Sequence, residues 1–178
     1  MSGHSKWSQI KHKKGATDQK KAAVFSKLLN AIAVAARENP NPDFNPRLRS
    51  TIEKARAANV PGENIERAIN KSGETKQLEE VIIEAYGPEG CALIIEGITD
   101  NTNRTIQQVR QILADHGAKM AEQGSVRWAF EHTGGAWRAK FPQSVSSDAQ
   151  KDLAALVSDL EEHADVQRII TNAATNDR

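Results

Sequence analysis

The chain has 178 residues, of which 38% are hydrophobic and 26% are charged, and its formal net charge is +1. This composition is typical of a soluble protein with one domain or two small ones. No apolar run approaches the ~20 residues that cross a bilayer, and no apolar stretch follows the basic start as it would in a secretory signal. The single cysteine, Cys91, has no partner for an internal disulfide, so we expect a cytoplasmic protein without a membrane partner.

Charge is divided unevenly along the sequence. Residues 1–74 contain 14 Lys and Arg against 7 Asp and Glu, a balance of +7, whereas residues 75–178 contain 10 against 16, a balance of −6. The first part therefore attracts polyanions and the second does not. The balance changes near the polar stretch SGETKQ, so we predict two domains, residues 1–76 and 77–178.

The sequence opens with MSGHSKWSQIKHKKG, which contains four lysines, a tryptophan and two histidines but no acidic residue. Lysines that neutralise phosphates release condensed counterions, and flat side chains stack on unpaired bases. We therefore interpret this basic arm, residues 1–15, as a nucleic-acid-binding element. The alternative is a solubilising tail in which Trp7 is a packing anchor. A metal site is not expected, because His4 and His12 lie among lysines that repel cations and no further ligands are close.

Three helices are predicted after the arm. Residues 17–37 are rich in Ala and Leu and place apolar side chains at the spacing of one helical face: Phe25, Leu28, Leu29, Ile32 and Ala36. Lys20 and Lys27 are two helical turns apart, so they share a side away from Phe25. Residues 46–59 and 63–73 form two more helices, the first with Pro46 in its first turn and the second ended by Gly73. Their inner faces are expected to contain Leu48, Ile52, Ala55, Ile65, Ala68 and Ile69.

The second and third helices also have the approximate spacing of a helix-turn-helix, with Gly62 in the turn. In a DNA-binding regulator of that kind, the third helix would present Asn64, Arg67, Asn70 and Lys71 to the groove. Glu63 and Glu66 weigh against this interpretation, because carboxylates at the start of the helix would meet phosphates and base acceptors with like charge. Acidic residues there suit the dipole of a structural helix instead.

After residue 80 the pattern predicts an α+β sandwich in the order ββαββαβ, an antiparallel sheet with two helices on one face. Strands are indicated by VIIEAYG, CALIIEGI, SVRWAFEH, AWRAKF and DVQRIIT, and helices by RTIQQVRQILADHG and residues 146–163. In SVRWAFEH, the alternation of Val126, Trp128 and Phe130 predicts one buried strand face. Trp128 is therefore expected in the core.

No residue stands out as catalytic. The sequence lacks a Walker loop, a GxGxxG motif and a nucleophile elbow. Cys91 lies between apolar neighbours on a predicted strand, where a small buried residue is the simpler interpretation. We therefore expect a non-enzymatic protein with no cofactor.

Four motifs, in this order, resemble those of one family: GHSKWSQIKHKKGATDQKKAAVFSKL, NPRLRSTIEKARAANVPGENIERAI, YGPEGCALIIEGITDNTNRT and GSVRWAFEHTG. Over about residues 2–136 the sequence is similar to the YebC/PmpR family, bacterial relatives of mitochondrial translational activators. The resemblance implies an RNA- or ribosome-binding translation factor that relieves stalled synthesis, for example at consecutive prolines. Because bacterial members are described as transcriptional regulators, duplex DNA bound by the helical domain is the alternative.

Two departures from the family pattern are visible. Only RAKFPQSVSSDAQ separates the last strand pair from the final helix and strand, so the chain resembles a shortened member without the inserted third domain. Thr102 also stands where the family often has Arg, beside Arg104. With ribosomal RNA or the ribosome as the expected partner, the residues predicted to contact nucleic acid are His4, Lys6, Trp7, Lys11, His12, Lys13, Lys14, Lys20, Lys21, Lys27, Arg47, Arg49 and Arg104.

Overall fold

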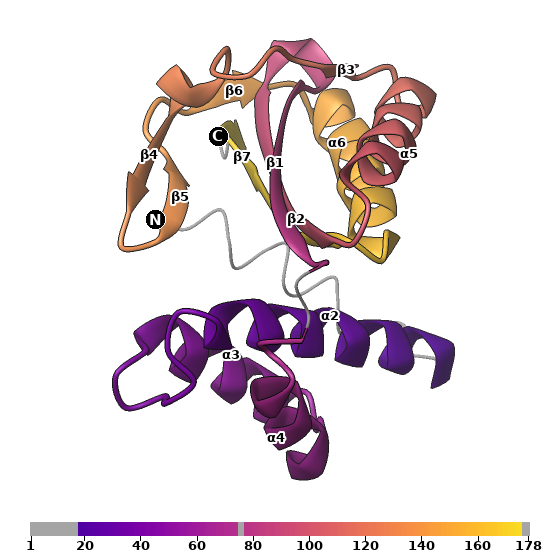
Figure 1. Cartoon of the computed structure of the whole chain (residues 1–178). Coiled ribbons are helices and arrows are strands. Elements are labelled where there is room, and N and C mark those ends of the chain that lie inside the picture. The colour runs from indigo at the N-terminus through magenta and orange to yellow at the C-terminus, as the bar shows by residue number, and fades with distance from the viewer. Residues whose placement is uncertain (1–17, 75–76, 176–178) are drawn as a thin grey trace. The chain divides into compact units, whose positions relative to one another are not determined.

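The structure is a computed structural model of the chain, and it describes residues 18–74 and 77–175 (Figure 1). These residues form two compact units. The helical unit contains the described residues up to Val81, together with Ile98–Thr102, and the sheet unit contains Ile82–Gly97 and the described residues from Asn103 onward. The helices are α2 (Asp18–Ala36), α3 (Pro46–Ala57), α4 (Gly62–Asn70), α5 (Thr102–Asp115) and α6 (Ser147–Glu162). The strands are β1 (Glu79–Tyr86), β2 (Ala92–Thr99), β3 (Lys119–Met120), β4 (Phe130–Thr133), β5 (Ala136–Ala139), β6 (Gln143–Val145), β7 (Val166–Thr171) and β8 (Ala173–Thr175).

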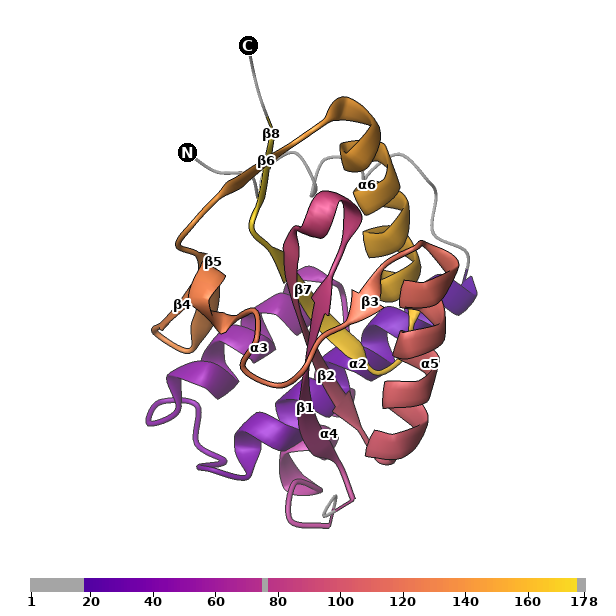
Figure 2. The ribbon, with the colours of Figure 1, turned by 90° about the horizontal axis from the view of Figure 1, so that it is seen from above.

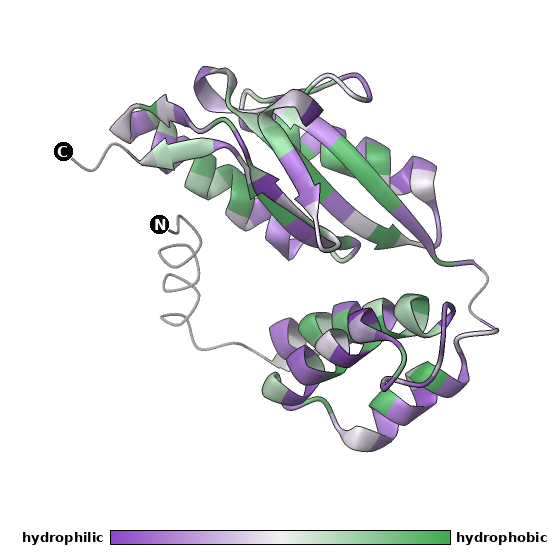
Figure 3. Ribbon diagram, turned by 90° about the vertical axis from the view of Figure 1, so that its left-hand side faces the viewer, coloured by the Kyte–Doolittle hydropathy of each residue, from purple (hydrophilic) through white to green (hydrophobic). Residues whose placement is uncertain are grey.

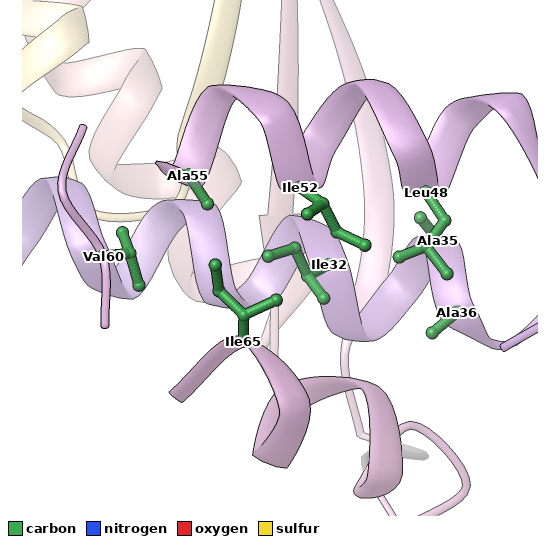
Figure 4. Packing of buried hydrophobic residues seen from close by; sticks show 8 residues of the cluster. All are labelled: Ile32, Ala35, Ala36, Leu48, Ile52, Ala55, Val60 and Ile65. Carbon is green, nitrogen blue, oxygen red and sulfur yellow. The ribbon is translucent and has the colours of Figure 1, made fainter. Parts of the chain in front are cut away.

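The core of the helical unit lies where α2, α3 and α4 meet. Side chains from all three helices and from the turn before α4 point toward one another there (Figure 4): Ile32, Ala35, Ala36, Leu48, Ile52, Ala55, Val60 and Ile65. Phe25, Leu28 and Leu29 pack at its edge. Each helix alternates hydrophobic and hydrophilic residues (Figure 3), as an amphipathic helix does. The three helices predicted from the apolar periodicity, and the residues predicted for their inner faces, are confirmed.

A buried asparagine fixes the corner between α2 and α3. Asn45 is 4% exposed, and its side-chain amide donates hydrogen bonds of 2.8 Å to the carbonyl oxygens of Ala35 and Asn39. Its Oδ1 accepts from the backbone N–H of Leu48 at 3.0 Å, which caps the start of α3. One side chain therefore satisfies the end of one helix and the beginning of the next.

The sheet unit is built on a four-stranded sheet in the order β3-β1-β2-β7. β1 pairs with β3 and β2 pairs with β7, both antiparallel, and Ile94 lies opposite Ile170. Helices α5 and α6 lie together on one side of this sheet, as the two views in Figures 1 and 2 agree. Their buried faces include Val109 and Leu113 on α5 and Leu153, Leu156 and Leu160 on α6. The predicted α+β class, with two helices on one face of an antiparallel sheet, is confirmed.

A β-hairpin covers part of the opposite face of the sheet. Strands β4 and β5 are antiparallel partners, and Figures 1 and 2 both show them on the side away from α5 and α6. The residues that join hairpin and sheet form a second core: Ala92, Ile94, Val126, Ala129, Phe130 and Ile170. A separate short pair joins β6 to β8 in parallel, and the sequence pattern did not predict it.

The prediction that Trp128 is buried is wrong. Arg127–Ala129 forms a short 3₁₀ turn, the strand begins only at Phe130, and Trp128 is 58% exposed. Three residues complete one turn of a 3₁₀ helix, so Val126 and Ala129 face the core while Trp128 faces outward. Val126 and Phe130 are buried as expected.

The segment that leads into this turn is hydrogen-bonded to Glu84, a 3% exposed glutamate on β1. Its carboxylate accepts from the backbone N–H groups of Gly124 and Val126 and from Nε of Arg127, at 2.8, 3.0 and 2.8 Å. Burial alone would raise the pKa of Glu84, but these hydrogen bonds and the Arg127 charge hold that pKa below its ordinary value. The carboxylate thus organises the segment before Trp128 around itself.

Candidate nucleic-acid interface

Seven of the predicted contact residues belong to the basic arm and lie outside the described residues: His4, Lys6, Trp7, Lys11, His12, Lys13 and Lys14. Their assignment stays a prediction. The remaining six are in the described part of the chain, five of them on the helices of the helical unit.

The lysines of α2 lie on its solvent side. Lys20 and Lys21 are exposed and Lys27 is half-buried, while Phe25 packs against the core of the helical unit. One helix therefore buries its apolar side and presents cations on another, which is the arrangement expected from the spacing of Lys20 and Lys27.

The helical unit contains a groove of about 280 Å³ between α2 and α4. It is lined by Leu29, Asn30, Ala33, Asn64, Arg67, Ala68 and Lys71. Its lining combines three apolar residues, two amides and two cations, and it includes no acidic residue. Asn64, Arg67 and Lys71 follow at intervals of three and four residues, so they share one side of α4. Amides and cations without a carboxylate form a surface that suits phosphates and base edges.

The groove partly agrees with the helix-turn-helix interpretation. Asn64, Arg67 and Lys71 line it as that interpretation requires, but Asn70 does not. At about 100° per residue, Glu66 lies on the side of α4 opposite Asn64 and Lys71, and Asn70 lies about 100–120° around the helix from these two residues. The two glutamates at the start of α4, Glu63 and Glu66, are also outside the lining.

Sequence reasoning missed Asn30. It is a half-buried amide in the otherwise apolar stretch LLNAIAVAA of α2, and this polar interruption is the signal by which the sequence could have identified it. Its role depends on α4 packing beside α2, which is a tertiary contact.

Arg47 is already paired within the helical unit. Its guanidinium donates to the carboxylate of Glu80 and forms an ion pair of 3.5 Å with Glu38. The hydrogen bond with Glu80 is the main cause of a raised pKa of Arg47. A phosphate would have to compete with two carboxylates for this cation, whereas Arg49 is exposed on the same helix.

Arg104 belongs to the other unit and to another network. Its guanidinium lies 2.9 Å from Oδ2 of Asp165, which also accepts a 2.6 Å hydrogen bond from the hydroxyl of Thr105. These contacts tie the start of α5 to the chain just before β7. The structural role of Arg104 is therefore evident, and its predicted contact with nucleic acid stays a prediction.

Other classes of site find little support in the described residues. Burial raises the pKa of the Cys91 thiol, which is fully enclosed, so the residue is a poor nucleophile there. No group of three or more His, Cys, Asp or Glu side chains in this part of the chain is placed to hold a metal ion. The described helices include none that is long and apolar enough to cross a bilayer.

Comparison with known proteins identifies the family. The sequence model for the TACO1/YebC protein N-terminal domain matches residues 5–75, and that for the TACO1/YebC second and third domain matches residues 78–136. The chain belongs to the TACO1/YebC family. The first match includes most of the basic arm and the whole three-helix segment, so both are family features.

Two TACO1/YebC relatives are named "Probable transcriptional regulatory protein". The relative in Fervidobacterium nodosum is 53% identical over 138 residues, which are 75% of this chain and 55% of the relative. The relative in Petrotoga mobilis is 45% identical over 179 residues, which are 96% of this chain and 70% of the relative. The chain therefore spans little more than half the length of the first relative and about two thirds of the second.

A solved structure supports the same assignment. The crystal structure of a conserved hypothetical protein, Aq1575 from Aquifex aeolicus, matches with a TM-score of 0.84 and 32% sequence identity. The match covers 98% of each chain. The fold described above is thus similar to one that a sequence 32% identical adopts in a crystal.

Proposed function

We propose that this protein is a non-enzymatic, RNA-binding translation factor that acts on the ribosome in the cytoplasm and relieves stalled synthesis, for example at consecutive prolines. The observation that carries the proposal is the charge balance of +7 in residues 1–74 against −6 in the remainder. A positive field over one part of a nearly neutral chain concentrates polyanions at that part. Ribosomal RNA is the abundant cytoplasmic polyanion with an irregular, partly unpaired surface.

The helical unit supports this proposal with an ordered site. The groove between α2 and α4 presents Asn30, Asn64, Arg67 and Lys71 without an acidic neighbour in its lining. This mixture of apolar, amide and cationic side chains suits a backbone phosphate with an adjacent sugar or base edge. The basic arm, with Trp7 among its lysines, would add stacking on unpaired bases.

Transcriptional regulation through duplex DNA is the second candidate, because the relatives carry that name and α4 places Arg67 on an accessible groove. However, α4 has only 9 residues and has Glu63 in its first turn. Base-reading helices contact DNA through their N-terminal residues, and a carboxylate there meets the phosphates with like charge. RNA is therefore the preferred ligand.

Ribosome co-sedimentation tests the proposal. The full chain should sediment with ribosomes at ~150 mM salt, and ribosomal RNA should compete better than random or promoter duplex DNA at equal phosphate concentration. Replacing Lys11, Lys13 and Lys14 together with Ala should weaken binding and lower its salt dependence by up to about three phosphate equivalents.

A matched control distinguishes an effect of the groove from the effect of losing positive charge elsewhere on the helical unit. The double variant Arg67→Ala and Lys71→Ala removes two cations from the groove, and Lys54→Ala with Arg56→Ala removes two exposed cations from the end of α3. Only the first pair should weaken ribosome binding strongly. If a specific DNA duplex outcompetes ribosomal RNA, and Arg67→Ala abolishes that preference, the regulator function replaces the one proposed.

A further inference from the structure

The sheet unit displays two large aromatic side chains on its surface. Trp128, from the turn before β4, is 58% exposed, and Phe141, after β5, is 52% exposed. Their ring centroids are 6.3 Å apart and their planes differ by 29°. We call these two residues the aromatic platform. Single exposed apolar residues are ordinary, but adjacent aromatic rings of this size on a surface indicate a binding site.

The platform is held in place by the backbone beneath it. The backbone N–H groups of Lys140 and Phe141 both donate to the carbonyl oxygen of Ala129, at 2.8 and 3.2 Å, so the chain leaving β5 returns beside Trp128. On the other side, Glu84 fixes Val126 and Arg127 through hydrogen bonds. A ligand therefore meets rings that are already positioned, and little conformational freedom is lost on binding.

A lysine lies beside the platform although residues 75–178 are acidic overall. Residues 127–141 contain three basic residues and one acidic residue, Glu131. Residues 75–178 as a whole have a formal net charge of −6. Lys140 Nζ lies 5.4 Å from the ring centroid of Phe141. Arg138 is exposed on β5, opposite Glu131 on β4. Arg127 is paired with Glu84 and lies over Trp137, so it contributes to the framework.

We propose that the aromatic platform is a second nucleic-acid site, which binds unpaired bases of single-stranded RNA by stacking while Lys140 contacts an adjacent phosphate. Stacking is open to every base because each has an aromatic face, and the lysine provides the attraction that depends on salt. A duplex keeps its base faces inside the helix and cannot stack in this way. An apolar protein surface would cover the rings but would leave the ammonium of Lys140 without a partner.

This inference extends the proposed RNA binding to the sheet unit, and it rests on different residues. The test uses the full chain with labelled single strands of about 12 uridines or adenosines, and a duplex of the same length, measured by fluorescence anisotropy at ~150 mM salt. Trp128→Ala and Phe141→Ala should each weaken single-strand binding by roughly tenfold without changing the salt slope, and Trp128→Phe should restore most of the affinity. Lys140→Ala should instead lower the salt slope by about 0.7.

Phe44→Ala is the matched control, because Phe44 is a 76% exposed aromatic residue in the helical unit. It should leave single-strand affinity unchanged, and circular dichroism melts should show that all variants remain folded. The proposal is overturned if Trp128→Ala binds single strands as tightly as the unmodified chain. It is equally overturned if Trp128→Ala abolishes self-association in sedimentation while RNA affinity stays the same, which would identify a protein interface.

The two proposals can fail separately. If removal of Lys11, Lys13 and Lys14 abolishes ribosome binding while platform variants bind RNA normally, the proposed function stands and the platform site does not. If single-strand binding depends on Trp128 but the chain never sediments with ribosomes, the platform stands and the ribosomal function fails.

Discussion

Glu84→Gln tests whether the buried carboxylate organises the segment before Trp128. Oε1 accepts from the backbone N–H of Gly124 and from Nε of Arg127, both at 2.8 Å, and Oε2 accepts from the N–H of Val126 at 3.0 Å. Glutamine has nearly the same volume, so the substitution opens no cavity. It removes the charge and replaces one acceptor oxygen with a donor.

The expected cost follows from counting these hydrogen bonds. In the better orientation of the amide, only the N–H of Val126 loses its acceptor, and the other two bonds become bonds to a neutral oxygen. Hydrogen bonds to charged groups contribute about 1.5–3 kcal/mol and neutral ones about 1. The side chain of Arg127 is 41% exposed and keeps part of its hydration. The loss of stability should therefore be smaller than the ~3–5 kcal/mol that results when one partner of a fully buried ion pair is removed. We expect Glu84→Gln to lower the free energy of unfolding by about 2–3 kcal/mol at pH 7.

The pH dependence of the free energy of unfolding provides a second test of this reasoning. Burial opposes ionisation of Glu84, but the hydrogen bonds outweigh it and hold the folded-state pKa below the ordinary value. The stabilisation by Glu84 is thus complete above the unfolded pKa of about 4.3 and is lost as pH falls through the lower folded pKa. Urea unfolding followed by circular dichroism should show that the free energies of unfolding of the two proteins differ by a constant amount near neutral pH, and that this difference shrinks below about pH 4.

Glu131→Gln, at an exposed glutamate on β4, is the control and should cost less than about 0.5 kcal/mol. A difference below that value for Glu84→Gln at pH 7, or one that persists undiminished in acid, would refute the reasoning.

Three further predictions concern other parts of the molecule. Asn45→Ala should lower the free energy of unfolding by about 2–4 kcal/mol in urea titrations, because it removes a helix cap and two hydrogen bonds from a buried side chain. Trp128→Ala should cost less than about 1 kcal/mol because the ring is exposed, whereas Leu156→Ala, fully buried on α6, should cost about 2–5 kcal/mol in the same assay. Arg67→Ala should reduce the slope of log affinity for RNA against log salt by about 0.7–0.9, measured by anisotropy from low to high salt. An unchanged slope would mean that the groove does not contact phosphate.

The helices could be predicted because their signals are local. The apolar residues on the inner face of α3, Leu48, Ile52 and Ala55, recur with the helical period and are buried as expected. Pro46 and Asn45 mark the start of that helix within two residues of sequence. The class of the second unit followed from similar patterns, since β2 is predominantly apolar and α5 and α6 are amphipathic.

The features that sequence reasoning missed depend on residues far apart in the chain. Trp128 alternates with Val126 and Phe130 as a strand would, but the backbone before it forms a turn that is hydrogen-bonded to Glu84, 42 residues before Val126. The groove requires Asn30 on α2 to meet Arg67 on α4. The partner of Arg104 is Asp165, 61 residues away. A hydrophobic pattern with a period of two or 3.6 residues reports only on residues that are near one another in the sequence, so it cannot predict such pairings.

The pairing of β2 with β7 has a consequence for the order in which the protein forms. Ile94 lies opposite Ile170, and the N–H of Ala92 donates to Oδ1 of Asn172 across 80 residues of sequence. Closing so long a loop is slow, and the sheet cannot gain its fourth strand until β7 has been synthesised. The contacts between α2 and α4, in contrast, join residues that are made early and are separated by fewer residues than β2 and β7 are. During synthesis the helical unit should therefore fold first, while β2 still exposes an unpaired apolar edge that other chains could join.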